Sequence, residues 1–107
     1  MALYMFQASF TSEAWAKMVG EPQNREQAIR PMIEKLGGKL IGYWFAFGEC
    51  DAVVIVQMPD NVSAAAASLA ATAGGAVKSL KTTALMSVEE SMQAMRKAGA
   101  AGYRAPS

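Results

Sequence analysis

The chain of 107 residues has the size of one domain and is too short to form two hydrophobic cores. Its 52% hydrophobic and 18% charged residues exclude a disordered chain, and its net charge of +1 comes from scattered charges, without the basic patch of a nucleic-acid-binding protein. The absence of histidine and the single cysteine, Cys50, exclude imidazole catalysis, an internal disulfide and most zinc sites.

The N-terminal stretch predicts a strand followed by a short helix. Residues 3–10 are apolar and aromatic, without the polar spacing of a helix, which is typical of a buried strand. Thr11 or Ser12 then caps a helix over residues 13–18, which Gly20 ends. We therefore expect a strand and then a short helix at the start of the chain.

A second helix is predicted from Asn24 onward. Asn24 and Gln27 have the spacing of a capping box, and the apolar positions that follow have helical spacing: Ile29, Met32, Ile33 and Leu36. Gly37 and Gly38 end the helix. Pro31 lies inside it without an N–H to donate, so we expect a kink or a tightened first turn there.

The middle of the chain predicts a β-hairpin. Residues 39–46 and 51–58 are rich in β-branched and aromatic side chains and are separated by a short turn that contains Gly48. Both strands are apolar on both faces, whereas a half-exposed sheet should alternate apolar and polar residues. The predicted faces are Ile41, Tyr43 and Phe45 against Leu40 and Trp44, and Val53 and Ile55 against Val54, Val56 and Met58.

The C-terminal part predicts a helix, a strand and a last helix. Asp60 or Asn61 caps an alanine-rich helix that reaches Ala73, and residues 76–84 alternate loosely as a fourth strand. Ser87 and Glu90 form a capping box that opens a final helix whose apolar residues are expected to face inward: Val88, Met92 and Met95.

The predicted order of elements is β, split α, β, β, α, β, α. Two βαβ-like halves joined by a hairpin give an α+β ferredoxin-like βαββαβ sandwich, with a split first helix and an extra C-terminal helix. We expect one domain over residues 1–98 and a flexible tail over residues 99–107. Because the hairpin strands are apolar on both faces, a second copy of the chain is the expected cover for the outer face, either in a homodimer or in a higher homo-oligomer.

Four stretches together resemble the GYD-domain family, small bacterial proteins similar in fold to dimeric α-β barrels. They are EKLGGKLIG (Glu34–Gly42), the aromatic strand Tyr43–Phe47, the turn Gly48–Asp51 followed by AVVIVQMPD, and VKSLKTT (Val77–Thr83). The resemblance spans Leu3 to about Ala98 and implies a dimeric α-β barrel fold and self-association. Since the family is largely without assigned function, the resemblance implies no particular activity.

The chain departs from the family at its signature. Asp51 stands where the motif's aspartate is expected, but Cys50 replaces the tyrosine and Glu49 precedes it. If the family's tyrosine has a chemical role, this chain lacks that role or performs it with another residue. Cys50 itself is expected to fill space, because no positive neighbour that would activate its thiolate is evident.

Candidate catalytic residues are Asp51 and Tyr43. Asp51 at the end of the hairpin is either a proton acceptor in a cleft or a turn residue that accepts hydrogen bonds from nearby backbone amides. A set of aromatic residues, with polar residues that interrupt apolar segments, is predicted to line a pocket for a planar ligand or else to belong to the core: Tyr4, Phe6, Gln7, Arg30, Trp44, Phe45 and Lys81.

The leading functional hypothesis is a homo-oligomer that binds a small molecule, such as an aromatic compound, in an aromatic-lined pocket. One alternative is a cofactor-independent oxygenase, isomerase or lyase that acts on an aromatic or polyketide-like substrate, as some proteins resembling this chain do. The other is a structural oligomer without a pocket. We expect no cofactor, no metal, no nucleic-acid partner and no membrane insertion, and the N-terminus without a signal-like leader predicts a cytoplasmic location.

Overall fold

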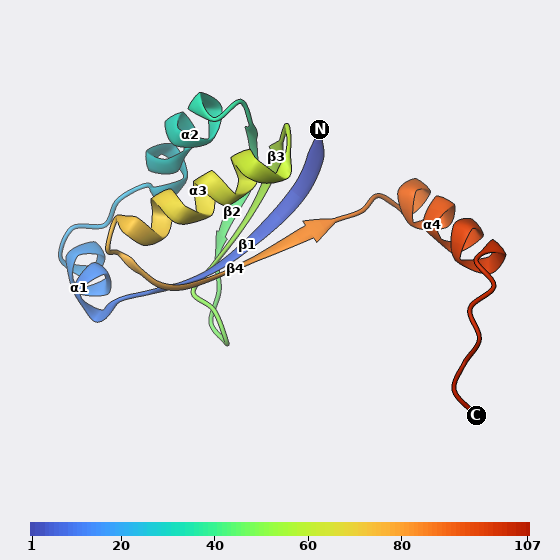
Figure 1. Cartoon of the computed structure of the whole chain (residues 1–107). Helices are drawn as coiled ribbons and strands as arrows, with labels where there is room; N and C mark the ends of the chain where they lie inside the picture. Colours follow the sequence, from blue (N-terminus) through green and yellow to red (C-terminus); the bar gives the residue numbers. More distant parts are fainter.

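The computed structural model describes all 107 residues and contains a four-stranded antiparallel sheet in the order β2-β3-β1-β4. The strands are β1 (Ala2–Phe10), β2 (Lys39–Phe45), β3 (Ala52–Met58) and β4 (Val77–Leu85). The helices are α1 (Ser12–Gly20), α2 (Arg25–Lys35), α3 (Asn61–Ala73) and α4 (Val88–Ala100). Helices α2 and α3 lie over one face of the sheet (Figure 1). The ferredoxin-like α+β fold predicted from the order of elements is therefore confirmed.

Side-chain caps start all four helices close to where the sequence predicts them. Thr11 caps α1, Asn24 caps α2 and Asp60 caps α3, each by accepting a backbone N–H of the first turn. Ser87 and Glu90 form the complete capping box of α4, with both bonds at 3.0 Å. Helix α2 continues through Pro31, whose side chain is exposed.

The core lies between the sheet and the two covering helices. Alternate residues of the two central strands are buried because they face α2 and α3: Tyr4, Phe6, Ala8 and Phe10 of β1, and Ala52, Val54, Val56 and Met58 of β3. Ile33 of α2 is 1% exposed, and Ala64 and Ala67 of α3 are 2% and 3% exposed. These three residues attach the helices to the sheet.

A β-bulge in β2 changes the predicted faces of that strand. Leu40 pairs with Val56 and Gly42 pairs with Ile55, so Ile41 is an extra residue in the ladder. Leu40 therefore shares the helix-covered face with Tyr43 and Phe45, contrary to the predicted alternation. The bulge could not be recognised from alternation, because every residue in this stretch except Gly42 is apolar.

The opposite face of the sheet has no helix over it. Strand pairing places one apolar set on this face: Leu3 and Met5 of β1, Trp44 of β2, Val53 and Ile55 of β3, and Leu85 of β4. Only neighbouring strands shield these side chains, and Trp44 remains 55% exposed. Within one chain, this apolar face meets solvent.

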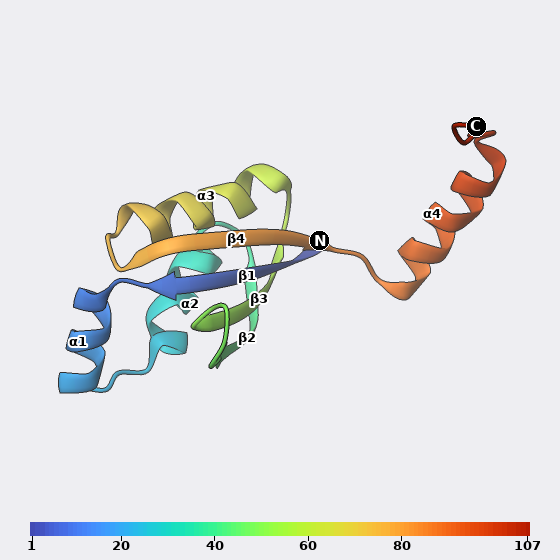
Figure 2. The ribbon, with the colours of Figure 1, turned by 90° about the horizontal axis from the view of Figure 1, so that it is seen from below.

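Helix α4 lies apart from the sheet, which corrects the expectation that its apolar residues face inward. Figures 1 and 2 show it beyond the end of β4, and Val88, Met92 and Met95 are 79%, 46% and 68% exposed. The radius of gyration is 17.1 Å, against about 13 Å for a compact chain of this length. The apolar spacing identifies one side of a helix, but it does not identify what that side contacts.

The last residues, 101–107, are exposed and form no helix or strand. None of the helices combines the length and the hydropathy needed to cross a membrane.

Candidate functional site

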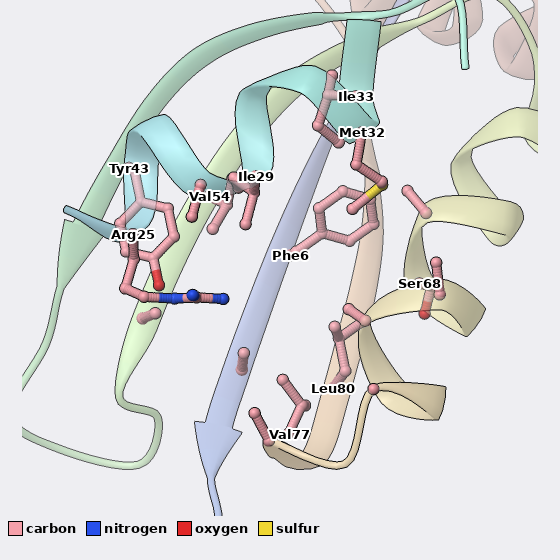
Figure 3. A pocket seen from close by; sticks show the side chains of 18 of the residues that line it. Phe6, Arg25, Ile29, Met32, Ile33, Tyr43, Val54, Ser68, Val77 and Leu80 are labelled. Atoms are coloured by element: carbon pink, nitrogen blue, oxygen red, sulfur yellow. The ribbon is translucent and has the colours of Figure 1, made fainter. Parts of the chain in front are cut away.

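A cavity of about 300 Å³ lies between the sheet and helices α2 and α3. The strands form its floor and the two helices form its walls, as Figure 3 shows. Of its 19 lining residues, 16 are hydrophobic, so a molecule inside it would contact mainly apolar side chains. The principal apolar contacts are Phe6, Ile29, Met32, Val54, Val77 and Leu80.

The small side chains of α3 explain why this space is not filled. In the first part of α3, Ala64 and Ala67 pack closely on the sheet. Farther along the helix, Ala70 and Ala71 line the cavity, and each contributes only a methyl group. A leucine at either position would occupy part of the space. The alanine-rich sequence thus allows the first part of α3 to pack closely on the sheet and leaves a cavity beside its last part.

Arg25 is the only charged residue that lines the cavity. It is the first residue of α2, and its Nη1 donates a hydrogen bond of 2.9 Å to Oε1 of Gln23. Glu26 does not neutralise it, because Glu26 pairs with Arg30 at 3.2 Å, and no carboxylate forms a salt bridge with Arg25. The cavity therefore contains a guanidinium group without an acidic partner.

The Tyr43 hydroxyl lies beside the Arg25 guanidinium at the same end of the cavity (Figure 3). Burial raises the pKa of Tyr43 above its ordinary value of 10.0, and the positive charge of Arg25 and a hydrogen bond with it partly oppose that rise. The phenol is therefore protonated at neutral pH. It remains able to donate a hydrogen bond to an acceptor on a bound molecule.

Asp51 joins the end of β1 to helix α1 and does not line the cavity. Its Oδ2 accepts hydrogen bonds from the backbone N–H of Phe10 at 2.9 Å and from Nε1 of Trp15 at 3.2 Å. The Trp15 ring also contacts Phe10, with ring centroids 5.5 Å apart, and Phe45, at 6.1 Å. Asp51 thus holds α1 against the sheet.

The structure separates the predicted site residues into three groups. Phe6 and Tyr43 line the cavity, and the Phe45 ring packs against Tyr43 at 5.4 Å without lining it. Tyr4 belongs to the core, where its hydroxyl donates to Oδ1 of Asn61. The third group, Gln7, Arg30, Trp44 and Lys81, lies outside both the cavity lining and the core.

Trp44, Gln7 and Lys81 lie in one row across the uncovered face of the sheet. Trp44 pairs with Val53, Val53 with Gln7, and Gln7 with Lys81. These three side chains point away from the cavity, because directly paired residues share a face. Arg30 also lies outside the cavity lining and pairs with Glu26 along the helix.

Arg25 is the charged cavity residue that was not among the predicted site residues. It precedes Ile29 by four residues and Met32 by seven, so helical periodicity places all three on one face of α2. Arg30 is one position beyond Ile29 and lies on a different face. Extending the apolar pattern of α2 backward to its first residue would have identified Arg25.

No group of three or more histidine, cysteine, aspartate or glutamate side chains lies close enough together to hold a metal ion. Cys50 is a free, half-buried thiol beside Asp51 in the hairpin turn.

The sequence profile described as "GYD domain" matches residues 4–95. The chain belongs to the GYD-domain family. The match covers β1 from Tyr4 onward, the other three strands and both helices that form the cavity, and this confirms the resemblance carried by the hairpin and its flanking segments. In this GYD domain, the aspartate of the hairpin turn has the observed role of joining β1 to α1.

The crystal structure of MtbAldR is similar to this GYD domain in fold, with a TM-score of 0.52 and 17% sequence identity. The similarity covers 80% of this chain and 52% of that chain, so the GYD domain spans about half the length of MtbAldR. At this identity the similarity shows the fold alone. Among curated proteins, none matches the chain significantly.

Proposed function

We propose that this protein binds a small, largely apolar molecule in the cavity between its sheet and helices α2 and α3. The observation that carries the proposal is a space of about 300 Å³ lined by 16 hydrophobic residues out of 19. An apolar cavity of roughly 150 Å³ is large enough to bind benzene. A space of twice that volume suits a bicyclic aromatic compound or a medium-length hydrocarbon chain.

Binding to the purified protein can be measured by thermal shift and by calorimetry with aromatic acids, aromatic alcohols and quinones. Ala71→Leu adds three carbons at the half-buried wall of the cavity and should weaken binding of any compound that raises the melting temperature. Ala65→Leu makes the same change on the exposed side of α3 and should leave binding unchanged. Equal binding by both variants, or no binding to the wild-type protein, would contradict the proposal.

The cavity supports binding more directly than it supports catalysis. A cofactor-independent enzyme would need a proton acceptor next to its substrate. Tyr43 contacts the cavity as a neutral phenol, whereas Asp51 accepts two hydrogen bonds outside the cavity lining. A filled interior would have favoured a purely structural oligomer.

We also propose that the protein acts as a homo-oligomer in which a second copy covers the helix-free face of the sheet. Val53, Ile55 and Met5 lie at the centre of that face without a covering helix. Burial of about 800 Å² per copy is typical of a stable complex. The exposed apolar side of α4 offers further surface next to the end of β4.

The test is the mass of the protein in solution. Ile55→Lys puts a charge at the centre of the uncovered face and should yield a folded monomer in sedimentation velocity. Leu69→Lys introduces the same charge on the solvent side of α3, where Leu69 is 69% exposed, and should preserve the oligomer. A wild-type protein that sediments as a folded monomer at micromolar concentration would overturn the proposal.

A further inference from the structure

The cavity has a chemical polarity that narrows the class of ligand. Its long apolar part lies between the strands and the α3 alanines, and its polar end carries Arg25 and Tyr43. Figure 3 shows the Arg25 side chain extending from the start of α2 toward β1, with the Tyr43 hydroxyl beside it. The apolar and cationic surfaces thus occupy different ends of one space.

Arg25 lies where the apolar cavity meets a polar groove. The groove shares Phe10, Arg25, Gly74 and Ala76 with the cavity and continues past Glu13, Lys17 and Gln23. A charged group of a ligand bound at Arg25 would therefore lie near solvent, while the rest of the ligand would contact the apolar lining. This arrangement lowers the cost of removing water from the charged group.

The unpaired positive charge of Arg25 favours an anion at this end of the cavity. No aspartate or glutamate lines the cavity, and the Arg25 guanidinium lacks a carboxylate partner. A ligand end without a hydrogen-bond acceptor would leave the Arg25 N–H donors unpaired, a neutral acceptor would not balance the positive charge, and a cationic ligand would add repulsion. A carboxylate can accept two parallel hydrogen bonds from a guanidinium and a third from a protonated phenol.

We propose that the ligand is an apolar carboxylic acid, bound as its carboxylate by Arg25 and Tyr43 with its hydrocarbon or aromatic part in the cavity. This inference rests on the proposed binding function and adds the chemical class of the ligand. Phe6, Ile29, Met32 and Leu80 contact the apolar part. Binding is reversible and involves no covalent step.

The experiment compares two pairs of probes that differ in charge at one end. The rigid pair is 2-naphthoate and 2-naphthylmethanol, and the flexible pair is octanoate and 1-octanol. Dissociation constants are measured by calorimetry at neutral pH on the full chain. The carboxylate of the acid accepts charge-assisted hydrogen bonds from Arg25, whereas the alcohol does not carry the opposite charge. In at least one of the two probe sets, the acid should therefore bind about 10-fold to 100-fold more tightly than the alcohol.

Variants at Arg25 test whether this residue causes the difference. Arg25→Gln should remove the preference for the acid while the affinity for the alcohol changes by less than about twofold, since the apolar contacts remain. Arg25→Lys retains the charge but not the paired donors and should keep part of the preference. Tyr43→Phe should weaken the acid alone. Arg30→Gln, on the same helix but outside the cavity, is the matched control and should behave as wild type.

The outcomes separate this inference from the proposed function. If acid and alcohol bind equally well, the carboxylate assignment is overturned and binding to the cavity stands. If Arg25→Gln weakens acid and alcohol alike, Arg25 supports the shape of the cavity and the assignment is again overturned. If neither member of either pair binds to the wild-type protein, the proposed function falls together with this inference. Far-ultraviolet circular dichroism on each variant verifies that it is folded.

Discussion

The role of Asp51 can be tested by removing its side chain. In Asp51→Ala, the backbone N–H of Phe10 loses the acceptor that it has at 2.9 Å, and Nε1 of Trp15 loses the acceptor at 3.2 Å. The two donors differ in how easily water can replace the lost acceptor. The Phe10 N–H lies at the end of β1 beside a ring that is 6% exposed, whereas the half-buried Trp15 ring is closer to water.

The expected cost follows from these two bonds. An enclosed backbone donor that loses its acceptor costs about 1–3 kcal/mol, and the more accessible bond to Trp15 adds about 1 kcal/mol. Asp51→Ala should therefore lower the free energy of unfolding by about 2–4 kcal/mol. For a domain of this size, each kcal/mol corresponds to a decrease of roughly 4–8 °C in melting temperature. Asp51→Asn keeps one acceptor oxygen and should cost about 1 kcal/mol.

Urea unfolding followed by circular dichroism measures these differences, with all variants at one protein concentration because self-association adds to apparent stability. Glu49→Ala, an exposed neighbour in the same turn, is the control and should leave the midpoint unchanged. Equal midpoints for Asp51→Ala and wild type would refute the structural role. So would an Asp51→Asn protein of full stability that no longer bound ligand, because that result would place Asp51 in the binding chemistry.

Three further predictions concern packing and pH. Gly38→Ala should destabilise the fold by about 1–3 kcal/mol in urea unfolding, because the new methyl group would clash with the Met58 sulfur and with the Gln57 carbonyl oxygen, the latter at 2.6 Å. Gly48→Ala is the control and should be neutral, because no atom lies within 4 Å of the methyl group that it adds. The Ser63 backbone amide donates a hydrogen bond to Asp60, and the Ser87 backbone amide donates one to Glu90; these bonds lower the pKa values of the two carboxyl groups below their ordinary values of 3.8 and 4.5. The stability that the two ionised carboxylates contribute should therefore be present above these ordinary values and should be lost as the pH falls through the lower pKa values of the folded protein. Melting temperatures recorded from neutral to acidic pH check this, and Asp60→Asn, which caps without titrating, should reduce the dependence; an unchanged profile would contradict the assignment. Burial raises the pKa of Tyr43 above 10.0, so the stability that its neutral form contributes should be complete below pH 10.0 and should be lost as the pH rises through the folded-state pKa. In an alkaline titration, the difference in phenolate absorbance between wild type and Tyr43→Phe should therefore appear at a higher pH than the absorbance of an ordinary tyrosine.

The elements of this fold could be predicted because their signals are local. Caps such as Ser87 with Glu90 and glycines such as Gly37 mark where helices begin and end, and the observed boundaries follow them closely. The order of elements then limited the sheet to few topologies. Gly37 has a φ of 85°, a conformation in which its lack of a side chain is required.

Two features of the structure, one in the site and one outside it, depend on interactions between segments and were therefore not predictable. The bulge at Ile41 shifts the faces of β2, so Trp44 lies opposite the cavity and Tyr43 lines it. The exposed position of α4 depends on the path that the chain takes after Leu85, which its helical periodicity does not specify. In contrast, Arg25 follows from the period of α2 and was within reach of the sequence.

The cavity obtains its charge and its volume from different helices. The guanidinium group belongs to α2, whereas the space exists because α3 presents alanines such as Ala70 and Ala71. In the proposed binding mode, replacement of one α3 alanine by a larger or smaller residue would alter the length of ligand accepted and would leave the contact between Arg25 and the ligand's carboxylate in place. Across related chains, ligand size and ligand charge could thus diverge independently, each through substitutions on one helix.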